Sequence, residues 1–150
     1  MKVREIMNKD VITVIEDMDL SRLLSLFREA RITGAPVVDR DSKLVGIVSK
    51  DDVLYRRQNP ERTSTPLDFE QLFKGGFAAV GGGPKQATKV REVMTREVIS
   101  VRQDTPIGEA CRLLWERCIQ RLPVVEDNQL VGLVSVQDIC RAVAEGRLKP

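Results

Sequence analysis

An internal repeat constrains the fold of this chain more than any other feature of its sequence. Residues 3–7 (VREIM) return as residues 90–94 (VREVM), and residues 44–49 (LVGIVS) return as residues 130–135 (LVGLVS). Two further segments repeat between them in the same order: 11–14 (VITV) with 98–101 (VISV), and 36–38 (PVV) with 123–125 (PVV). Four matches in one order indicate two copies of one structural unit.

Each copy has the pattern of a strand, a helix, two strands and a second helix. A β-branched run at 11–14 indicates a short buried strand, and apolar residues at helical spacing follow it at 20–30. Strands at 36–38 and 44–49 then flank a polar turn. One such unit leaves a face of its sheet uncovered and is too small to be stable alone. We therefore predict an α+β fold with two repeats packed sheet to sheet about a pseudo-twofold axis.

The repeat also predicts the division of the chain. Repeat one spans 1–57, repeat two spans 90–150, and a linker at 58–89 has room for a short helix at 67–73. Each repeat opens with an entrance segment that ends in a methionine, Met7 or Met94. We expect each methionine to plug the space between its entrance segment and a sheet.

Composition argues against several classes of protein. The net charge is +2 and is spread evenly, so no basic patch indicates nucleic-acid binding, and no apolar run is long enough to span a bilayer. The chain has no histidine, and its three cysteines form no C-x-x-C pair. We therefore expect no metal site, no catalytic cofactor and no enzyme activity. No leader pattern follows Met1, so we expect a cytoplasmic protein.

A Ser-x-x-Asp pattern marks the place where the last strand of each copy gives way to a helix. It consists of Ser49 and Asp52 in copy one, and of Ser135 and Asp138 in copy two. One interpretation is a helix-capping box. The other is a ligand site, because a helix N-terminus attracts a phosphate and a carboxylate suits the paired hydroxyls of a ribose. The sequence leaves both interpretations open.

Together these motifs resemble a tandem pair of cystathionine-β-synthase (CBS) domains, also called a Bateman module. The resemblance rests on VREIM and VREVM, on GAPVV and RLPVV, and on the closing GIVSKDD and GLVSVQD, and it covers both copies. It implies a cleft between the repeats that binds AMP, ADP, ATP or S-adenosylmethionine. It also implies a ribose-binding role for Asp52 and Asp138, and a phosphate-binding role for Ser49 and Ser135.

The adenine ring of such a ligand needs an apolar slot, which the first strand and the residues before each proline supply. The candidates are Val11, Ile12, Ile32, Thr33 and Ala35 in copy one, and Val98, Ile99, Ile119, Gln120 and Leu122 in copy two. The alternative for these residues is the hydrophobic core.

Two basic residues are candidates for phosphate binding. Arg121, two residues before Pro123, resembles the phosphate-binding residue of CBS modules that sense adenylates, and Lys50 follows Ser49 directly. The alternative for Arg121 is a solvated surface position. The matching positions hold Gly34 and Val136, so we do not expect the two sites to be equivalent.

The leading hypothesis is a non-catalytic regulatory module that binds an adenine nucleotide or a related adenosyl ligand and signals by conformational or oligomeric change. The alternative is a constitutive dimerisation or scaffold module without a ligand. The partners expected are an adenosine-type small molecule, a second copy of the chain and a separate effector protein, with no nucleic acid and no membrane. We expect the homodimer to form through the CBS helices, where Trp115 and Phe27 lie.

Overall fold

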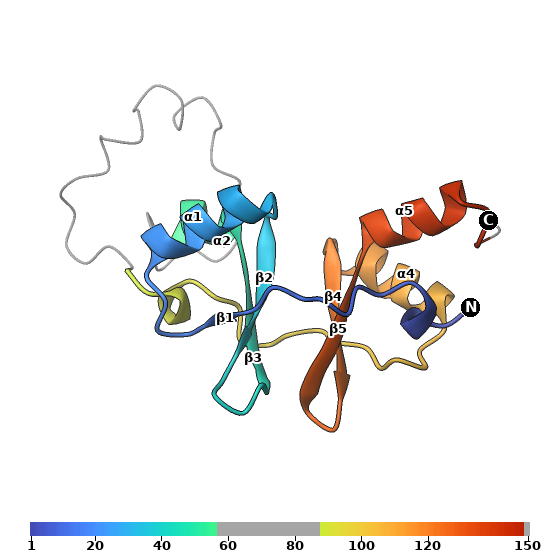
Figure 1. Ribbon diagram of the computed structural model, residues 1–150, viewed down its shortest axis with the longest axis horizontal. Helices are drawn as coiled ribbons and strands as arrows, with labels where there is room; N and C mark the ends of the chain where they lie inside the picture. The colour runs from blue at the N-terminus through green and yellow to red at the C-terminus, as the bar shows by residue number, and fades with distance from the viewer. Residues whose placement is uncertain (57–87, 149–150) are drawn as a thin grey trace.

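Each copy of the repeat forms a β-hairpin with helices beside it in the computed structural model, which describes residues 1–56 and 88–148 (Figure 1). The elements of copy one are η1 (Val3–Glu5), β1 (Val14–Ile15), α1 (Leu20–Ala30), β2 (Gly34–Val38), β3 (Leu44–Ser49) and α2 (Lys50–Arg56). Those of copy two are η2 (Val90–Glu92), α4 (Ile107–Glu116), β4 (Arg121–Glu126), β5 (Gln129–Ser135) and α5 (Val136–Ala144). The short helix predicted at 67–73 lies outside the described residues.

The two sheets lie side by side in the middle of the molecule, and the helices lie on the outer sides (Figure 1). In copy one, β2 pairs in parallel with β1 and antiparallel with β3. In copy two, β4 pairs antiparallel with β5, and a single parallel bridge joins Val101 to Val124. That bridge corresponds to the pairing of Val14 with Val37 in copy one. The α+β fold with two sheets packed against each other is confirmed.

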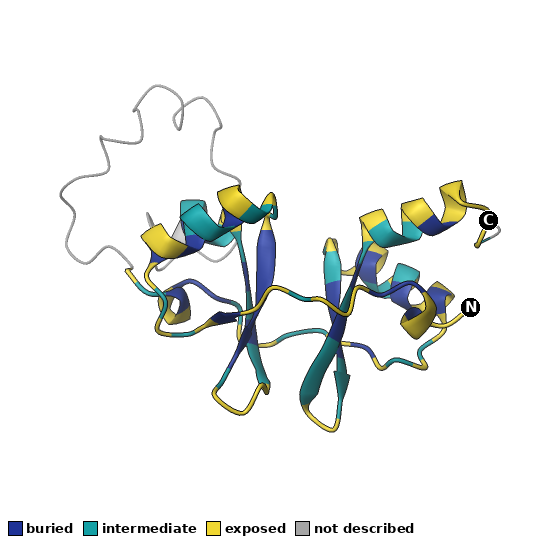
Figure 2. Cartoon of the chain, viewed as in Figure 1, coloured by how far each residue is buried: buried dark blue, intermediate teal, exposed yellow. Residues whose placement is uncertain are grey.

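The helices form where the apolar spacing predicts them. Leu20, Leu23 and Phe27 lie on one face of α1 and are buried, while the opposite face is exposed (Figure 2). The side chain of Phe27 is 3% exposed and packs in the core, so it is not part of the exposed side of α1 that a second chain could contact. Trp115 on α4 is different, since 80% of its surface is exposed.

The entrance segments, residues 1–8 and 88–95, cross over, so that each packs against the half formed by the other copy of the repeat. Val3 and Met7 belong to the hydrophobic cluster of the second half, and Val90 and Met94 belong to the cluster of the first half. Backbone hydrogen bonds join the entrance segments to the opposite hairpins: Asn8 N–H donates to Leu133 at 2.8 Å, and Ile47 N–H donates to Thr95 at 2.9 Å. The hydrophobic clusters of the two halves are therefore interlocked.

This exchange corrects the predicted first strands. The strand expected at 11–14 is β1 at Val14–Ile15, and in copy two Val101 alone makes the corresponding bridge. The physical reason is that residues 9–13 carry the chain from the second half, where Asn8 pairs with Leu133, to β1 in the first half. Val11 and Ile12 therefore connect the two halves and do not lie in a strand.

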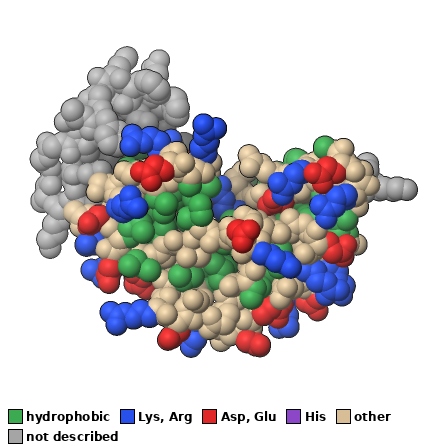
Figure 3. All heavy atoms as spheres, viewed as in Figure 1, with side chains coloured by type: hydrophobic (Ala, Val, Ile, Leu, Met, Phe, Trp, Pro, Cys, Tyr) green, Lys and Arg blue, Asp and Glu red, His purple; other side chains and the backbone are tan. Residues whose placement is uncertain are grey.

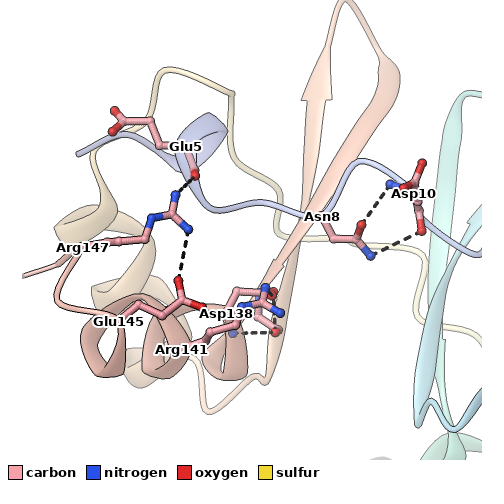
Figure 4. A network of polar contacts seen from close by, with 8 residues as sticks. Glu5, Asn8, Asp10, Asp138, Arg141, Glu145 and Arg147 are labelled. Carbon is pink, nitrogen blue, oxygen red and sulfur yellow. Dashed lines mark hydrogen bonds and ion pairs between the residues drawn. The ribbon is translucent and has the colours of Figure 1, made fainter.

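The methionines of the entrance segments do plug the space next to a sheet, and each sheet is that of the opposite repeat. A Cβ at Gly132 in β5 would lie 2.7 Å from Met7 Sδ, and a Cβ at Gly46 in β3 would lie 2.8 Å from Met94 Sδ. These glycines leave room for the methionines. A hydrogen bond also ties the first entrance segment to the C-terminal end of the described chain: Arg147 Nη2 donates to the carbonyl oxygen of Glu5 at 2.6 Å (Figure 4).

Alanine at Gly46 is expected to lower the free energy of unfolding by about 1–3 kcal/mol, the usual cost of overpacking a core. The added methyl group meets Met94 and the Thr95 carbonyl oxygen, which lies 3.0 Å away. Gly108→Ala is the control, because no atom lies within 4 Å of its Cβ position on α4, and we expect it to stabilise by about 0.4–1 kcal/mol. Urea denaturation measures both. An unchanged G46A would mean that Met94 moves aside freely.

The charged side chains are mixed on the face drawn in Figure 3, where lysine and arginine alternate with aspartate and glutamate. Among the helices within residues 1–56 and 88–148, none is long and apolar enough to cross a membrane.

Candidate functional site

A cleft of about 580 Å³ lies between the end of β3 in copy one and two segments of copy two. Its volume is in the range of small-molecule sites. Copy one contributes Thr33, Ile47, Ser49, Lys50, Asp51 and Asp52 to the lining. Copy two contributes Thr95, Glu97, Val98, Ile99, Cys118, Ile119, Gln120 and Arg121. Because both copies line it, this cleft depends on how the two halves are arranged.

The cleft brings together many of the residues that the sequence nominated. The polar candidates from copy one are Ser49, Lys50 and Asp52, together with Thr33 from the adenine set. The candidates from copy two are Val98, Ile99, Ile119, Gln120 and Arg121. Side chains predicted to contact phosphate, ribose and adenine thus line one cavity. Some of them lie far apart in the chain: Arg121 and Thr33, which are 88 residues apart, form a hydrogen bond.

Two of the adenine candidates lie elsewhere. The side chains of Ala35 and Leu122 are 0% exposed and pack in the hydrophobic clusters of the first and second halves. For these two side chains the alternative of the hydrophobic core is the one observed, so only their backbone groups remain candidates for contact with an adenine ring.

The remaining candidates are outside the lining of this cleft. Val11 lines a smaller pocket of about 140 Å³ beside β5, and Ile12 is 40% exposed. Ile32 packs against the cluster of the first half. Ser135 and Asp138 lie at the start of α5, in the position that corresponds to Ser49 and Asp52.

Both Ser-x-x-Asp patterns form helix-capping boxes. In copy one, Asp52 Oδ2 accepts from the backbone N–H of Ser49 at 2.8 Å, and Asp52 N–H donates to Ser49 Oγ at 3.2 Å. In copy two, Asp138 makes the same pair of bonds with Ser135, and it also accepts from Arg141 at 2.7 Å (Figure 4). The cap fixes the Asp52 carboxylate at a position that lines the cleft, so capping and ligand binding are compatible there.

Arg121 extends from β4 across to the first half. Its Nη2 donates to Thr33 Oγ1 at 2.7 Å, and its guanidinium lies against the backbone of Gly34. Burial of the half-buried side chain lowers the pKa of Arg121, but an arginine stays protonated at neutral pH. It takes part in none of the ion pairs formed within residues 1–56 and 88–148. A partly desolvated cation without a carboxylate partner in this part of the chain suits an anionic ligand.

Sequence reasoning missed several lining residues, notably Thr95, Glu97 and Asp51. Thr95 and Glu97 follow the entrance segment of copy two, which pairs with β3 of copy one through Ile47. No local pattern indicates that pairing. The two missed carboxylates, Asp51 and Glu97, matter because they line the same cleft as Asp52 and the cations Lys50 and Arg121. The cleft therefore presents charges of both signs to a ligand.

A family model, the CBS domain, matches residues 3–59 and 90–145. The chain belongs to the CBS domain family. The two matches coincide with the two copies of the repeat, and they confirm the identification of tandem CBS repeats.

Two proteins of one archaeon resemble this chain over most of its length. The uncharacterized protein MJ1426 of Methanocaldococcus jannaschii is 36% identical over 154 residues, which cover 95% of this chain and 91% of that protein. Inosine-5'-monophosphate dehydrogenase of the same organism is 30% identical over 141 residues, but the match covers 93% of this chain and 23% of the dehydrogenase. The part of the dehydrogenase that resembles this chain is therefore a small part of that enzyme.

A solved structure extends the similarity to three dimensions. The structure of CBSX2, an Arabidopsis thaliana protein, in complex with AMP matches with a TM-score of 0.74 and 27% sequence identity. The match covers 98% of each chain. A CBS pair with the same fold thus binds AMP.

Proposed function

We propose that this chain is a non-catalytic regulatory module that binds an adenine nucleotide, or a related adenosyl ligand, in the cleft between its two CBS repeats. The observation that carries the proposal is the composition of the 580 Å³ cleft, in which both halves contribute apolar, cationic and carboxylate side chains. The complex of CBSX2 with AMP supports the choice of ligand class.

The parts of an adenine nucleotide correspond to separate regions of the cleft. Lys50 and Arg121 supply positive charge for the phosphate, and Arg121 offers the planar donor geometry that phosphates favour. The Asp52 carboxylate would accept hydrogen bonds from the ribose hydroxyls. Val98 and Ile119 are half-buried and give the adenine ring apolar surface.

Binding would act as a signal because the ligand touches both halves. A ligand that contacts both lining surfaces favours the arrangement of halves in which both contacts form, and it shifts the population towards that arrangement. Output through a separate effector protein, or through a homodimer formed by the helices, is part of this proposal, as is a cytoplasmic location. The 80% exposed Trp115 on α4 supports a helix-mediated contact.

A constitutive scaffold without a ligand is the second candidate. The observation that favours it is the pair of capping boxes, because helix capping already gives Ser49 and Asp52 a structural role. In a scaffold, the Ser-x-x-Asp motifs would stabilise helices and do nothing else.

A thermal-shift experiment separates the two candidates. AMP, ADP, ATP and S-adenosylmethionine at about 1 mM are compared with GTP as the control. A ligand at 100 times its Kd adds about 2.7 kcal/mol to the stability of the folded state. At about 2–4 °C per kcal/mol, we expect one adenosyl ligand to raise Tm by about 5–10 °C. If none of them raises Tm, the scaffold is correct and the proposal fails.

A further inference from the structure

A second cavity, of about 140 Å³, lies beside the segment 9–13 that connects the two halves. Its lining consists of Lys9, Val11, Thr13, Val38, Ser42, Leu130, Val131 and Gly132, none of which lines the cleft of 580 Å³. It also lies apart from the end of β5 that bears Ser135, because Leu130 precedes Ser135 by five residues, which is about 17 Å along a strand. The cavity is therefore distinct from the Ser-x-x-Asp ends of both copies.

The polar side chains of this cavity suit a small anion. Lys9 is the one charged side chain among the described residues that line it, and Thr13 and Ser42 each add a hydroxyl group. All three are exposed, so an anion can reach them from solvent. Lys9 takes part in none of the ion pairs formed within residues 1–56 and 88–148. An unpaired cation beside two hydroxyl donors matches a tetrahedral oxyanion. The volume is also well below the roughly 300–1,000 Å³ of sites for drug-sized ligands.

Ser42 has a backbone conformation that serine rarely adopts. Its φ is 61°, in the left-handed region, where glycine and asparagine are more usual. The matching residue of copy two is Asn128, which has a φ of 64° and does not belong to the lining of this cavity. The same turn is thus made with a favoured residue in copy two and with a less favoured one in copy one. Strained positions cluster at ligand sites, and the hydroxyl in the cavity is a reason for serine at this turn.

The cavity also lies where the two hairpins meet. Ser42 belongs to the turn between β2 and β3 of copy one, and Leu130 belongs to β5 of copy two. The N–H of Leu130 donates to the carbonyl oxygen of Ser42 at 3.4 Å, and a bridge joins Lys43 to Gln129. An anion in this cavity would therefore contact residues of both halves.

We propose that this cavity binds a small inorganic oxyanion of the size and charge of phosphate, held by Lys9, Thr13 and Ser42. The ammonium group of Lys9 supplies the positive charge, and the two hydroxyl groups donate hydrogen bonds. The bound anion links the connecting segment 9–13 to the turn of copy one, and it stabilises the folded chain because it binds only the folded state. The site does not depend on the adenosyl ligand of the proposed function.

Calorimetric titration of the full chain with inorganic phosphate, at constant ionic strength set with sodium chloride, tests the site. Lys9→Met and Ser42→Gly are each expected to weaken phosphate binding by about 10- to 150-fold, the loss typical of a hydrogen bond to a charged group. Ser42→Gly removes the hydroxyl but relieves the left-handed backbone, so its Tm without phosphate should be unchanged or higher, which shows that it folds.

The repeat offers a matched control for each variant. Asn128→Gly makes the same backbone change at the matching turn, and Arg96→Met removes the cation that matches Lys9. Neither residue lines the cavity, so both controls should bind phosphate as the unmodified protein does.

The outcomes also separate this site from the cleft. No phosphate binding by the unmodified protein, or unchanged affinity in Lys9→Met or Ser42→Gly, would overturn the inference. Phosphate affinity lost in Lys50→Met and retained in Lys9→Met would place the anion in the cleft and overturn it as well. Phosphate binding that needs Lys9, in a protein that binds no adenosyl ligand, would support this site while the proposed function fails.

Discussion

Alanine in place of Asp52 is expected to weaken AMP binding by about 10- to 150-fold, whereas alanine in place of Asp138 leaves AMP binding unchanged. Asp52 lines the cleft that holds Lys50 and Arg121, and its carboxylate is the proposed acceptor for the ribose hydroxyls. Loss of a hydrogen bond to a charged group costs about 1.5–3 kcal/mol, and each 1.4 kcal/mol is a factor of ten in affinity.

The two variants are matched in helix capping, because both aspartates make the same bonds to a serine three residues earlier. Asp138 also pairs with the exposed Arg141, a contact that contributes little to stability. Both substitutions should therefore cost a similar amount of stability, about 0.5–2 kcal/mol, which urea denaturation checks. Calorimetric titration with AMP then isolates the binding effect. Equal losses of affinity in the two variants would contradict a single site beside Asp52, and unchanged affinity in both would mean that the motif is a cap alone.

The sequence predicts the elements of this fold well because they depend on local periodicity. The apolar spacing of Leu20, Leu23 and Phe27 identifies the buried face of α1, and the repeat then supplies the corresponding face of α4. The Ser-x-x-Asp pattern also locates the starts of α2 and α5 correctly. Each of these features depends on residues that are close together in the chain.

The exchange of entrance segments was beyond local reasoning. Val3 and Val90 are each simply an apolar residue in a repeated motif, and nothing near them specifies which half they enter. The contact between Gly34 and Arg121 is similar, because the sequence shows that the two copies differ at this position but not that the two positions meet. Pairings across the pseudo-twofold relation depend on the packing of the whole chain.

Alanine in place of Met7 or Met94 is expected to lower the free energy of unfolding by about 2–5 kcal/mol, as for other buried methionines. Met7 is 9% exposed and lies over Gly132, while Met94 is 4% exposed and lies over Gly46. Each truncation leaves a cavity against a glycine, which has no side chain to fill it. Met1→Ala is the matched control, because Met1 is 40% exposed and its loss should change stability by less than about 0.5 kcal/mol.

The place where protection is lost distinguishes interlocked halves from independent ones. Hydrogen exchange in Met7→Ala should accelerate first in β4 and β5 of the second half, since Met7 packs in that cluster. In Met94→Ala it should accelerate first in β2 and β3 of the first half. The reverse pattern, with each truncation loosening its own copy, would mean that the entrance segments do not cross over. A crossed pattern would mean that a segment of each copy stabilises the half formed by the other. The arrangement of the two halves that forms the cleft would then depend on both hydrophobic clusters.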